Sequence, residues 1–156
     1  MARTSRRAAE EQVLAALPGW VRVISQLNRL VADQMGVGSS DLDCLDALRR
    51  GGLATAAELA RRIGLTPGSV SRMIDRLDAA GCIKRLDDPH DRRRVLIEPT
   101  EDGLARIAAY YDGLTVRTHD DLAVFSTGEL DALLRFVQRS HASASDELTR
   151  LRHGTT

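Results

Sequence analysis

One stretch of the chain, residues 53–100, constrains the fold more than any other. Thr55 is followed by the helical sequence AAELARRI and by Gly64, a residue type that commonly ends helices. Thr66 and Pro67 then suit the N-cap and the first position of a second helix. Two short helices separated by so short a turn are predicted to form a helix-turn-helix motif.

The second of these helices, predicted for residues 67–80, has two chemically different faces. Apolar side chains at i, i+3, i+4 and i+7 form its inward face: Val70, Met73, Ile74 and Leu77. Hydroxyl and guanidinium donors lie on the outward side: Ser69, Ser71, Arg72 and Arg76. Arginine pairs bidentately with guanine or phosphate, and hydroxyls near a helix N-terminus suit phosphate. These four residues are therefore predicted to bind DNA, although Arg76 has Asp75 and Asp78 as alternative surface partners.

A hairpin is predicted directly after this helix. Residues 82–86 and 95–97 are short apolar segments with the composition of strands, and the loop between them, DDPHDRRR, is polar and turn-forming. The hairpin would be a wing beside the second helix, with arginines at its tip. The sequence therefore predicts a winged helix-turn-helix.

The charge distribution supports a nucleic-acid partner, although the net charge of the chain is zero. Between Arg49 and Arg94 there are eleven basic and six acidic residues, a net charge of +5, and the remainder carries −5. A local basic field is the form that a nucleic-acid contact surface takes. Aromatic residues make up only 3% of the chain, so its core is predicted to be aliphatic and its fold mainly helical.

Long helical patterns flank the central stretch. Residues 8–35 have helical spacing of apolar residues, interrupted by Pro18-Gly19, which predicts a kink or two consecutive helices. Ser39 or Ser40 is predicted to cap the next helix. A further helix begins at Thr100, and the box STGE at residues 126–129 starts the last one. The last helix has a heptad-like seam formed by Leu130, Leu134, Val137, His141, Ala144, Leu148 and Leu151. Such a seam predicts packing against another helix.

The central third resembles the MarR family of winged helix-turn-helix regulators. The segments ELARRIGLT, SVSRMIDRL and DDPHDRR, followed by PTEDG, carry the resemblance. It implies a homodimer that places two recognition helices in successive major grooves of double-stranded DNA, at a pseudo-palindromic operator. In the wing it implies that Asp91 orients Arg93, which enters a minor groove. Phosphate contacts are then assigned to Arg85, Arg92 and Arg94, while Pro67-Gly68 departs from the family pattern.

The predicted fold class is mainly α, with a small β component. We expect one MarR-like domain over residues 1–156. Within it, residues 39–100 would form the winged helix-turn-helix, and residues of about 8–38 and 118–152 would form dimerisation helices. The resemblance also implies a small-molecule effector, aromatic or phenolic, that releases the regulator, usually a repressor, from DNA. Trp20, Leu45 and Tyr111 are candidate ligand residues, although core packing is the preferred interpretation for Trp20.

Other classes of function have less support. No GxSxG, Walker, HExxH or GxGxxG motif occurs, so no catalytic residue and no cofactor are predicted. The candidate soft metal ligands are Cys44, Cys82, His90, His119 and His141. None of them has CxxC or HxxxH spacing, so no metal site is predicted. Both cysteines are interpreted as buried structural thiols. A metal- or redox-responsive regulator of the same fold is the alternative function. No apolar run approaches the ~18 residues of a membrane span, which predicts a soluble cytoplasmic protein.

Overall fold

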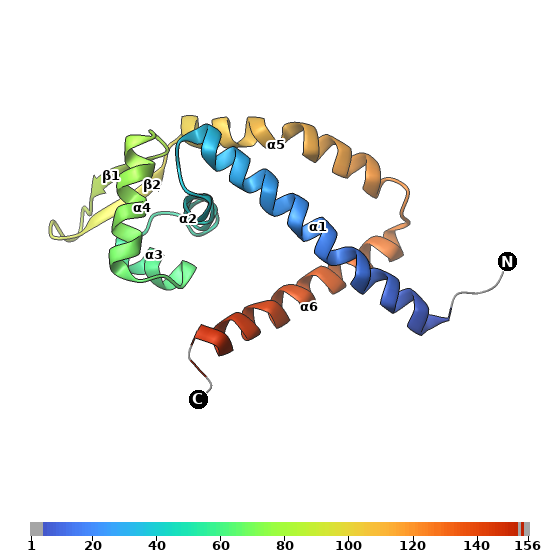
Figure 1. Ribbon diagram of the computed structural model, residues 1–156. Helices are drawn as coiled ribbons and strands as arrows, with labels where there is room; N and C mark the ends of the chain where they lie inside the picture. The colour runs from blue at the N-terminus through green and yellow to red at the C-terminus, as the bar shows by residue number, and fades with distance from the viewer. Residues whose placement is uncertain (1–4, 153, 155–156) are drawn as a thin grey trace. The chain divides into compact units, whose positions relative to one another are not determined.

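The computed structural model describes residues 5–152 and 154, and its chain divides after Tyr110 into two compact units (Figure 1). The fold is mainly helical with one antiparallel pair of strands, as the sequence predicted. The elements of the first unit are α1 (Arg6–Met35), α2 (Ser39–Gly51), α3 (Ala56–Ile63), α4 (Pro67–Ala79), β1 (Ile83–Asp87) and β2 (Val95–Pro99). Helix α5 (Glu101–Leu122) spans the division, and α6 (Thr127–Arg152) belongs to the second unit.

Helix α1 is a single helix. Ser5 caps its first turn by accepting a hydrogen bond from the Ala8 backbone N–H. The helix continues through Pro18, so the prediction of two consecutive helices is wrong. A proline removes one backbone hydrogen bond, but the flanking turns hold the remaining ones. The helix ends where Gly36 adopts the left-handed conformation, with φ of +71°.

Most of α1 contributes nothing to the core of this chain. Its buried residues are Val31, Ala32 and Met35, all near its C-terminal end. Trp20 is 64% exposed, so the preferred interpretation of this residue as core packing is wrong. Helical periodicity shows which side chains share a face, but it does not show what covers that face.

The core of the first unit lies between α2, α3, α4 and the sheet. The predicted inward face of α4 is confirmed, because Val70, Met73, Ile74 and Leu77 are all buried. They share the core with aliphatic residues of the neighbouring elements: Leu45, Leu48, Leu59, Ile83 and Ile97. Cys44 and Cys82 are also buried, as predicted. Helix α4 is therefore held by one complete apolar face.

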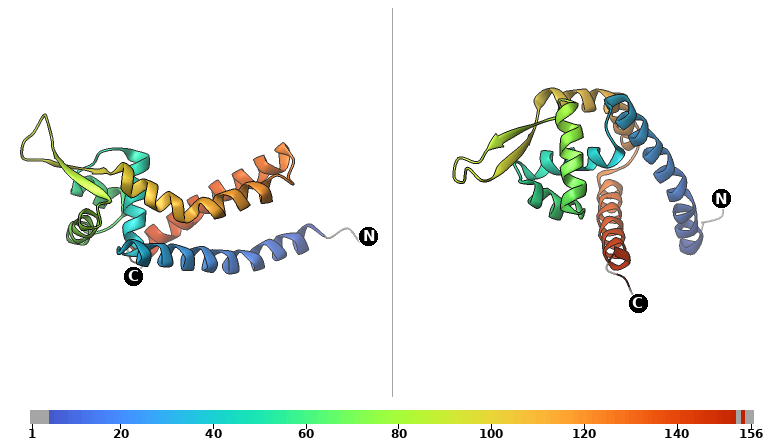
Figure 2. Two further views of the ribbon diagram at one scale, coloured as in Figure 1. Left: turned by 90° about the horizontal axis from the view of Figure 1, so that it is seen from above. Right: turned by 60° about the vertical axis from the view of Figure 1, so that its left-hand side comes forward.

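The predicted hairpin is present, with slightly shifted bounds. Strands β1 and β2 pair antiparallel, with Arg85 opposite Ile97 and Asp87 opposite Val95. Ala54, just before α3, extends the sheet by an isolated bridge in which its N–H and carbonyl both bond to Ile97. The hairpin projects beyond the helices of the first unit (Figure 2). Its root is thus connected to both helices of the helix-turn-helix.

The first turn of α5 lies directly against the backbone of Cys82. Thr100 donates through its hydroxyl to the Gly81 carbonyl and accepts from the Gly103 N–H. A Cβ atom at Gly103 would lie 2.6 Å from the Cys82 Cα. Only glycine allows this close approach, which sets the start of α5 at the joint between α4 and β1.

Helix α6 begins with the predicted capping box. Glu129 accepts hydrogen bonds from the backbone N–H and the hydroxyl of Ser126, and its own N–H donates to Ser126. No described residue of α6 is buried within this chain. No helix among the described residues combines the length and apolar character needed to cross a membrane.

Candidate nucleic-acid interface

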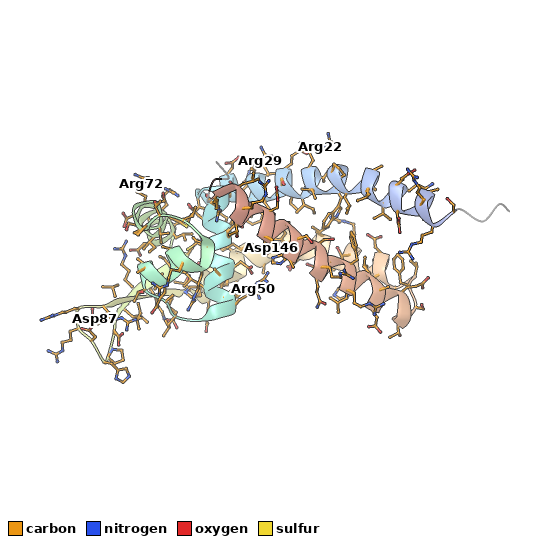
Figure 3. The ribbon with its side chains drawn as sticks, turned by 90° about the horizontal axis from the view of Figure 1, so that it is seen from below. Arg22, Arg29, Arg50, Arg72, Asp87 and Asp146 are labelled. Atoms are coloured by element: carbon orange, nitrogen blue, oxygen red, sulfur yellow. The ribbon has the colours of Figure 1, made fainter. Side chains whose placement is uncertain are left out.

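The N-terminal half of α4 presents polar donors to solvent. Thr66 caps the helix by accepting from the Ser69 N–H at 3.3 Å, and Pro67 occupies the first turn, as predicted. Ser71 is exposed and donates to the Pro67 carbonyl at 3.0 Å, while Ser69 is half-buried. Arg72 extends from the outer side of α4 (Figure 3). Among the described residues its side chain has no hydrogen bond or ion pair, so its donors are free for a ligand.

Arg76 is anchored to the core by a buried carboxylate. Its Nε and Nη2 atoms donate to the two carboxylate oxygens of Asp41, at 2.8 and 2.6 Å. Asp41 is 0% exposed and also accepts the Gly38 backbone N–H at 2.7 Å. The hydrogen bond to Asp41 raises the pKa of Arg76. The pair fixes the last turn of α4 to the start of α2.

The partner of Arg76 and the N-cap of α2 both differ from those predicted from the sequence. Asp75 and Asp78 were the alternative partners of Arg76, but its partner is Asp41, which is 35 residues away. The N-cap of α2 is Gly38 rather than either serine, Ser39 or Ser40, because the Asp41 carboxylate reaches back to the Gly38 N–H.

Arg85 connects β1 to α4. Its guanidinium lies 2.5 Å from Asp75 and 3.0 Å from Asp78, and the hydrogen bond to Asp75 raises the pKa of Arg85. Arg85 was predicted to contact the DNA backbone, and that assignment remains a prediction. What the structure adds is that both acidic residues of α4 are occupied by the same arginine.

The wing loop, residues 88–94, is a tight turn held by two aspartates. Asp88 accepts the His90 N–H at 2.9 Å, and Asp91 accepts the Arg93 N–H at 3.0 Å. Asp91 therefore contacts Arg93 through its backbone and fixes the conformation of the loop. The side chains of Arg92 and Arg93 are exposed and make no ion pair within the described part of the chain.

Arg94 differs from the two arginines before it. Its Nη2 lies 3.0 Å from Glu58 of α3, and its Nε lies 3.5 Å from Asp88 at the base of the wing. Glu58 itself completes the capping box of α3, where it accepts the Thr55 N–H at 2.8 Å. Those hydrogen bonds from Thr55, with a smaller effect of Arg94, hold the pKa of Glu58 below its usual value.

Comparison with known proteins identifies the family. Residues 35–94 match the MarR family. The chain is 34% identical over 125 residues to the uncharacterized HTH-type transcriptional regulator YcgE of Bacillus subtilis, covering 80% of this chain and 81% of that protein. The chain belongs to the MarR family of transcriptional regulators.

Two further MarR proteins agree with this assignment. The multiple antibiotic resistance protein MarR of Salmonella typhimurium is 29% identical over 103 residues, covering 66% of this chain and 72% of that protein. The crystal structure of a MarR mutant from E. coli, complexed with operator DNA, has a TM-score of 0.55 at 23% identity. That alignment covers 87% of this chain and 99% of the other, and it shows the shared fold.

Two acidic residues of this MarR-family site were missed in the sequence. Asp41 and Glu58 each lie three residues after the N-cap of a helix, at Gly38 and Thr55. The Thr55-x-x-Glu58 spacing is a capping-box signal and was readable. The arginine partners of Asp41 and Glu58 could not be read from the sequence, because each arginine lies on a different element from its carboxylate.

The three candidate ligand residues lie in different settings. Leu45 is part of the core, and Trp20 is exposed on α1. Tyr111 lines a cavity of about 360 Å³ along α5, together with Leu114, Thr118 and Leu122. Burial raises the pKa of Tyr111. Their role in binding an effector remains a prediction.

The thiols and potential metal ligands are also placed. Burial raises the pKa of Cys44 to about 11 and raises that of Cys82. Cys82 lies 3.4 Å from the guanidinium of Arg106, a neighbour that the sequence did not reveal. Within residues 5–152 and 154, no three His, Cys, Asp or Glu side chains are grouped to hold a metal ion.

Proposed function

We propose that this protein is a homodimeric repressor that binds a pseudo-palindromic DNA operator through α4 and the wing. The observation that carries this proposal is the exposed guanidinium of Arg72, which has no partner in the part of the chain that the structure describes, on a helix whose opposite face is fully buried. Such a helix is rigid and presents donors at one surface, as readout in a major groove requires. Arg92 and Arg93, which form no ion pair with any residue that the structure describes, add two exposed cations at the wing tip.

The relatives support DNA as the partner. A fold neighbour, MarR of E. coli, was crystallised with operator DNA. Another relative is named HTH-type transcriptional repressor NicR. The basic segment from Arg49 to Arg94, with its net charge of +5, lies on the unit that contains α4 and the wing. A regulator that binds DNA works beside the genome, so we place it in the cytoplasm.

The exposed apolar side chains of α1 and α6 support the homodimer. On α6 they follow the heptad-like seam, and Leu134 and Val137 are 54% and 53% exposed. On α1 they include Val13, Leu14, Trp20 and Val21. Exposed apolar rows of this kind mark protein interfaces. We propose that a second copy of the chain covers these apolar rows. Each chain would then act as one domain of the dimer, and the two recognition helices would lie about 34 Å apart.

Regulation by a small aromatic or phenolic effector completes the proposal. Such a ligand must bind more tightly to a dimer whose recognition helices are misplaced for the grooves. The metal- or redox-responsive alternative is less favoured, because both thiols are buried and have raised pKa values.

A salt series on operator binding tests the DNA proposal. The logarithm of the association constant should fall steeply with the logarithm of salt concentration, by about 0.9 per phosphate neutralised. Arg72→Ala should weaken binding by about tenfold or more, the value of one bidentate base contact. Arg22→Ala, the matched control on the exposed surface of α1, should change it little. A flat salt dependence would refute DNA binding.

Sedimentation equilibrium tests the homodimer. The wild-type chain should sediment at twice its 17.1 kDa mass. Val137→Glu places a charge in the proposed interface and should shift the population toward monomer. A wild-type protein that is monomeric at micromolar concentration contradicts the dimer and, with it, binding to a palindromic operator.

A further inference from the structure

The wing and the helix-turn-helix are connected by one arginine that joins two carboxylates. Arg94 bonds to Glu58 at 3.0 Å on α3 and to Asp88 at 3.5 Å on the wing. Helix α3 is the first helix of the motif. The contact therefore links the wing to the motif at a point 36 residues earlier in the chain.

Each member of this trio is also held by hydrogen bonds outside the trio. The backbone of Arg94 is fixed on both sides, because its N–H donates to the Asp91 carbonyl and its carbonyl accepts from the Asp88 N–H. Glu58 is held by the capping box of α3, and Asp88 is buried and holds the His90 N–H. Surface ion pairs are usually weak because two flexible side chains must be immobilised. Here the carboxylates of Glu58 and Asp88 are already held by other hydrogen bonds, so the Arg94 side chain is the main group that the ion pair must immobilise.

We infer that Glu58 and Arg94 are positioning residues that clamp the wing to α3 and so fix where Arg92 and Arg93 meet DNA. The sequence had assigned Arg94 to a phosphate contact, but its Nε and Nη2 point to the two carboxylates. Beyond this clamp, the wing is attached to the helices through its two strands. The clamp is an intramolecular contact, and its effect on DNA binding rests on the proposed function.

Glu58→Gln distinguishes the clamp from a phosphate contact by the sign of its effect. The amide oxygen of glutamine still accepts the Thr55 N–H, so the cap of α3 is kept while the ion pair is lost. If Arg94 is a clamp, operator affinity falls by about tenfold as a wing contact is lost. If Arg94 instead binds phosphate, removal of a competing negative charge raises affinity, and the inference is overturned.

Two control variants isolate the effect. Glu129→Gln neutralises the equivalent capping-box glutamate of α6, which accepts the Ser126 N–H at the same 2.8 Å distance. It should leave affinity unchanged. Asp87, on β1 (Figure 3), is not one of the carboxylates that bind Arg94. Asp87→Asn therefore removes one negative charge from the hairpin and keeps both ion pairs of the clamp, and it should raise affinity slightly. Arg94→Gln should weaken binding as Glu58→Gln does, and the double variant should be no weaker than either single variant.

Amide hydrogen exchange tests the clamp in the free protein. Exchange of the amides in residues 88–94 should be faster in Glu58→Gln than in wild type, with circular dichroism and thermal midpoint unchanged. Equal exchange in both proteins contradicts the clamp, whatever the DNA result. A wild-type protein with flat salt dependence refutes the proposed function but leaves the exchange result as a valid test of the clamp.

Discussion

Helix α4 and the wing loop both present arginines to solvent, but different forces hold them. Helix α4 buries a complete aliphatic face and joins α2 through the Asp41–Arg76 pair, whose carboxylate is fully buried. The wing loop buries only Asp88 and is held by short turns and a half-exposed ion pair. The Arg76 side chain is 47% exposed, but its partner carboxylate is fully buried. Buried apolar area and a buried carboxylate that needs a partner tie a segment to global stability, whereas pairs exposed on both sides affect it little.

This difference has a consequence for DNA recognition. A base-reading helix must keep its register within the major groove, and coupling to the core provides that rigidity. The wing loop is positioned by turns and by the exposed Arg94 ion pair, which contribute little to global stability. On this comparison, changes at the α4 anchor should lower stability, and changes at the wing should alter DNA affinity at nearly constant stability.

The largest expected effect is at the α4 anchor. Arg76→Met keeps most of the apolar stem but leaves the buried Asp41 carboxylate with the Gly38 N–H alone. The free energy of unfolding, measured in urea, should fall by about 3 kcal/mol, the cost of leaving a buried charge unpaired.

Arg72→Met is the matched control on the same helix. The Arg72 side chain is exposed and has no partner among the described residues, so the substitution should change stability by less than about 0.5 kcal/mol. If Arg76→Met and Arg72→Met destabilise the protein equally, then Arg76 does not anchor α4 more than Arg72 does.

A smaller effect is expected at the joint between the two regions. Gly103→Ala places a Cβ 2.6 Å from the Cys82 Cα and 2.8 Å from the Thr100 hydroxyl oxygen. The variant should lose about 2 kcal/mol of unfolding free energy, because neither the backbone nor the capping hydroxyl can move freely. Gly113→Ala in the same helix meets only the Arg117 guanidinium, at 3.4 Å, and should gain stability. If both alanines stabilise the protein, the joint is not tight.

The cap of α4 should contribute less again. Thr66→Ala removes the acceptor for the Ser69 N–H and the partner of the Ser69 hydroxyl at 2.9 Å. Chemical denaturation should show a loss of about 1 kcal/mol. Thr115→Ala, which removes a hydroxyl bonded within the exposed part of α5, should be nearly neutral. A neutral Thr66 variant would show that core packing alone holds the start of the helix.

The smallest effect compares the two buried thiols. Burial, with smaller effects of the charges on Asp41 and Asp43, raises the pKa of Cys44 to about 11. Burial also raises the pKa of Cys82, but Arg106 opposes the rise. Because a raised pKa keeps a thiol protonated at pH 8, both should react slowly with iodoacetamide. Single-cysteine variants should show Cys82, at the joint of the wing, reacting faster. If Cys44 reacts faster than Cys82, then α2 opens more readily than the start of the hairpin, and the comparison between core and wing is wrong.

Local patterns predicted most of the fold. The caps at Thr66 and Ser126 and the inward face of α4 were read from the sequence and are present. These features depend on hydrogen bonds and spacing within a few residues, which the sequence shows directly. The hairpin was also predicted, because its turn residues lie between two apolar segments.

Two local interpretations failed for related reasons. Trp20 was interpreted as a core residue because it falls on an apolar helical row, but within this chain nothing buries that row. Ser39 and Ser40 were expected to cap α2 because serine is a good N-cap, but a Gly38 cap with an Asp41 carboxylate is present instead. In both cases the competing arrangement depends on packing that composition does not reveal.

The sequence by itself predicted which residues face outward on α4 and at the wing tip, and with them the candidate DNA contacts Arg72, Arg92 and Arg93. Only the tertiary structure decided which arginines are anchors. Arg76 and Arg94 have the same guanidinium group as those three exposed arginines. Their guanidinium groups, however, are bound by carboxylates of residues 35 and 36 positions earlier in the chain. The reason is physical: helical and strand periodicity is fixed by neighbours along the chain, whereas an ion pair between elements exists only after the core has brought them together.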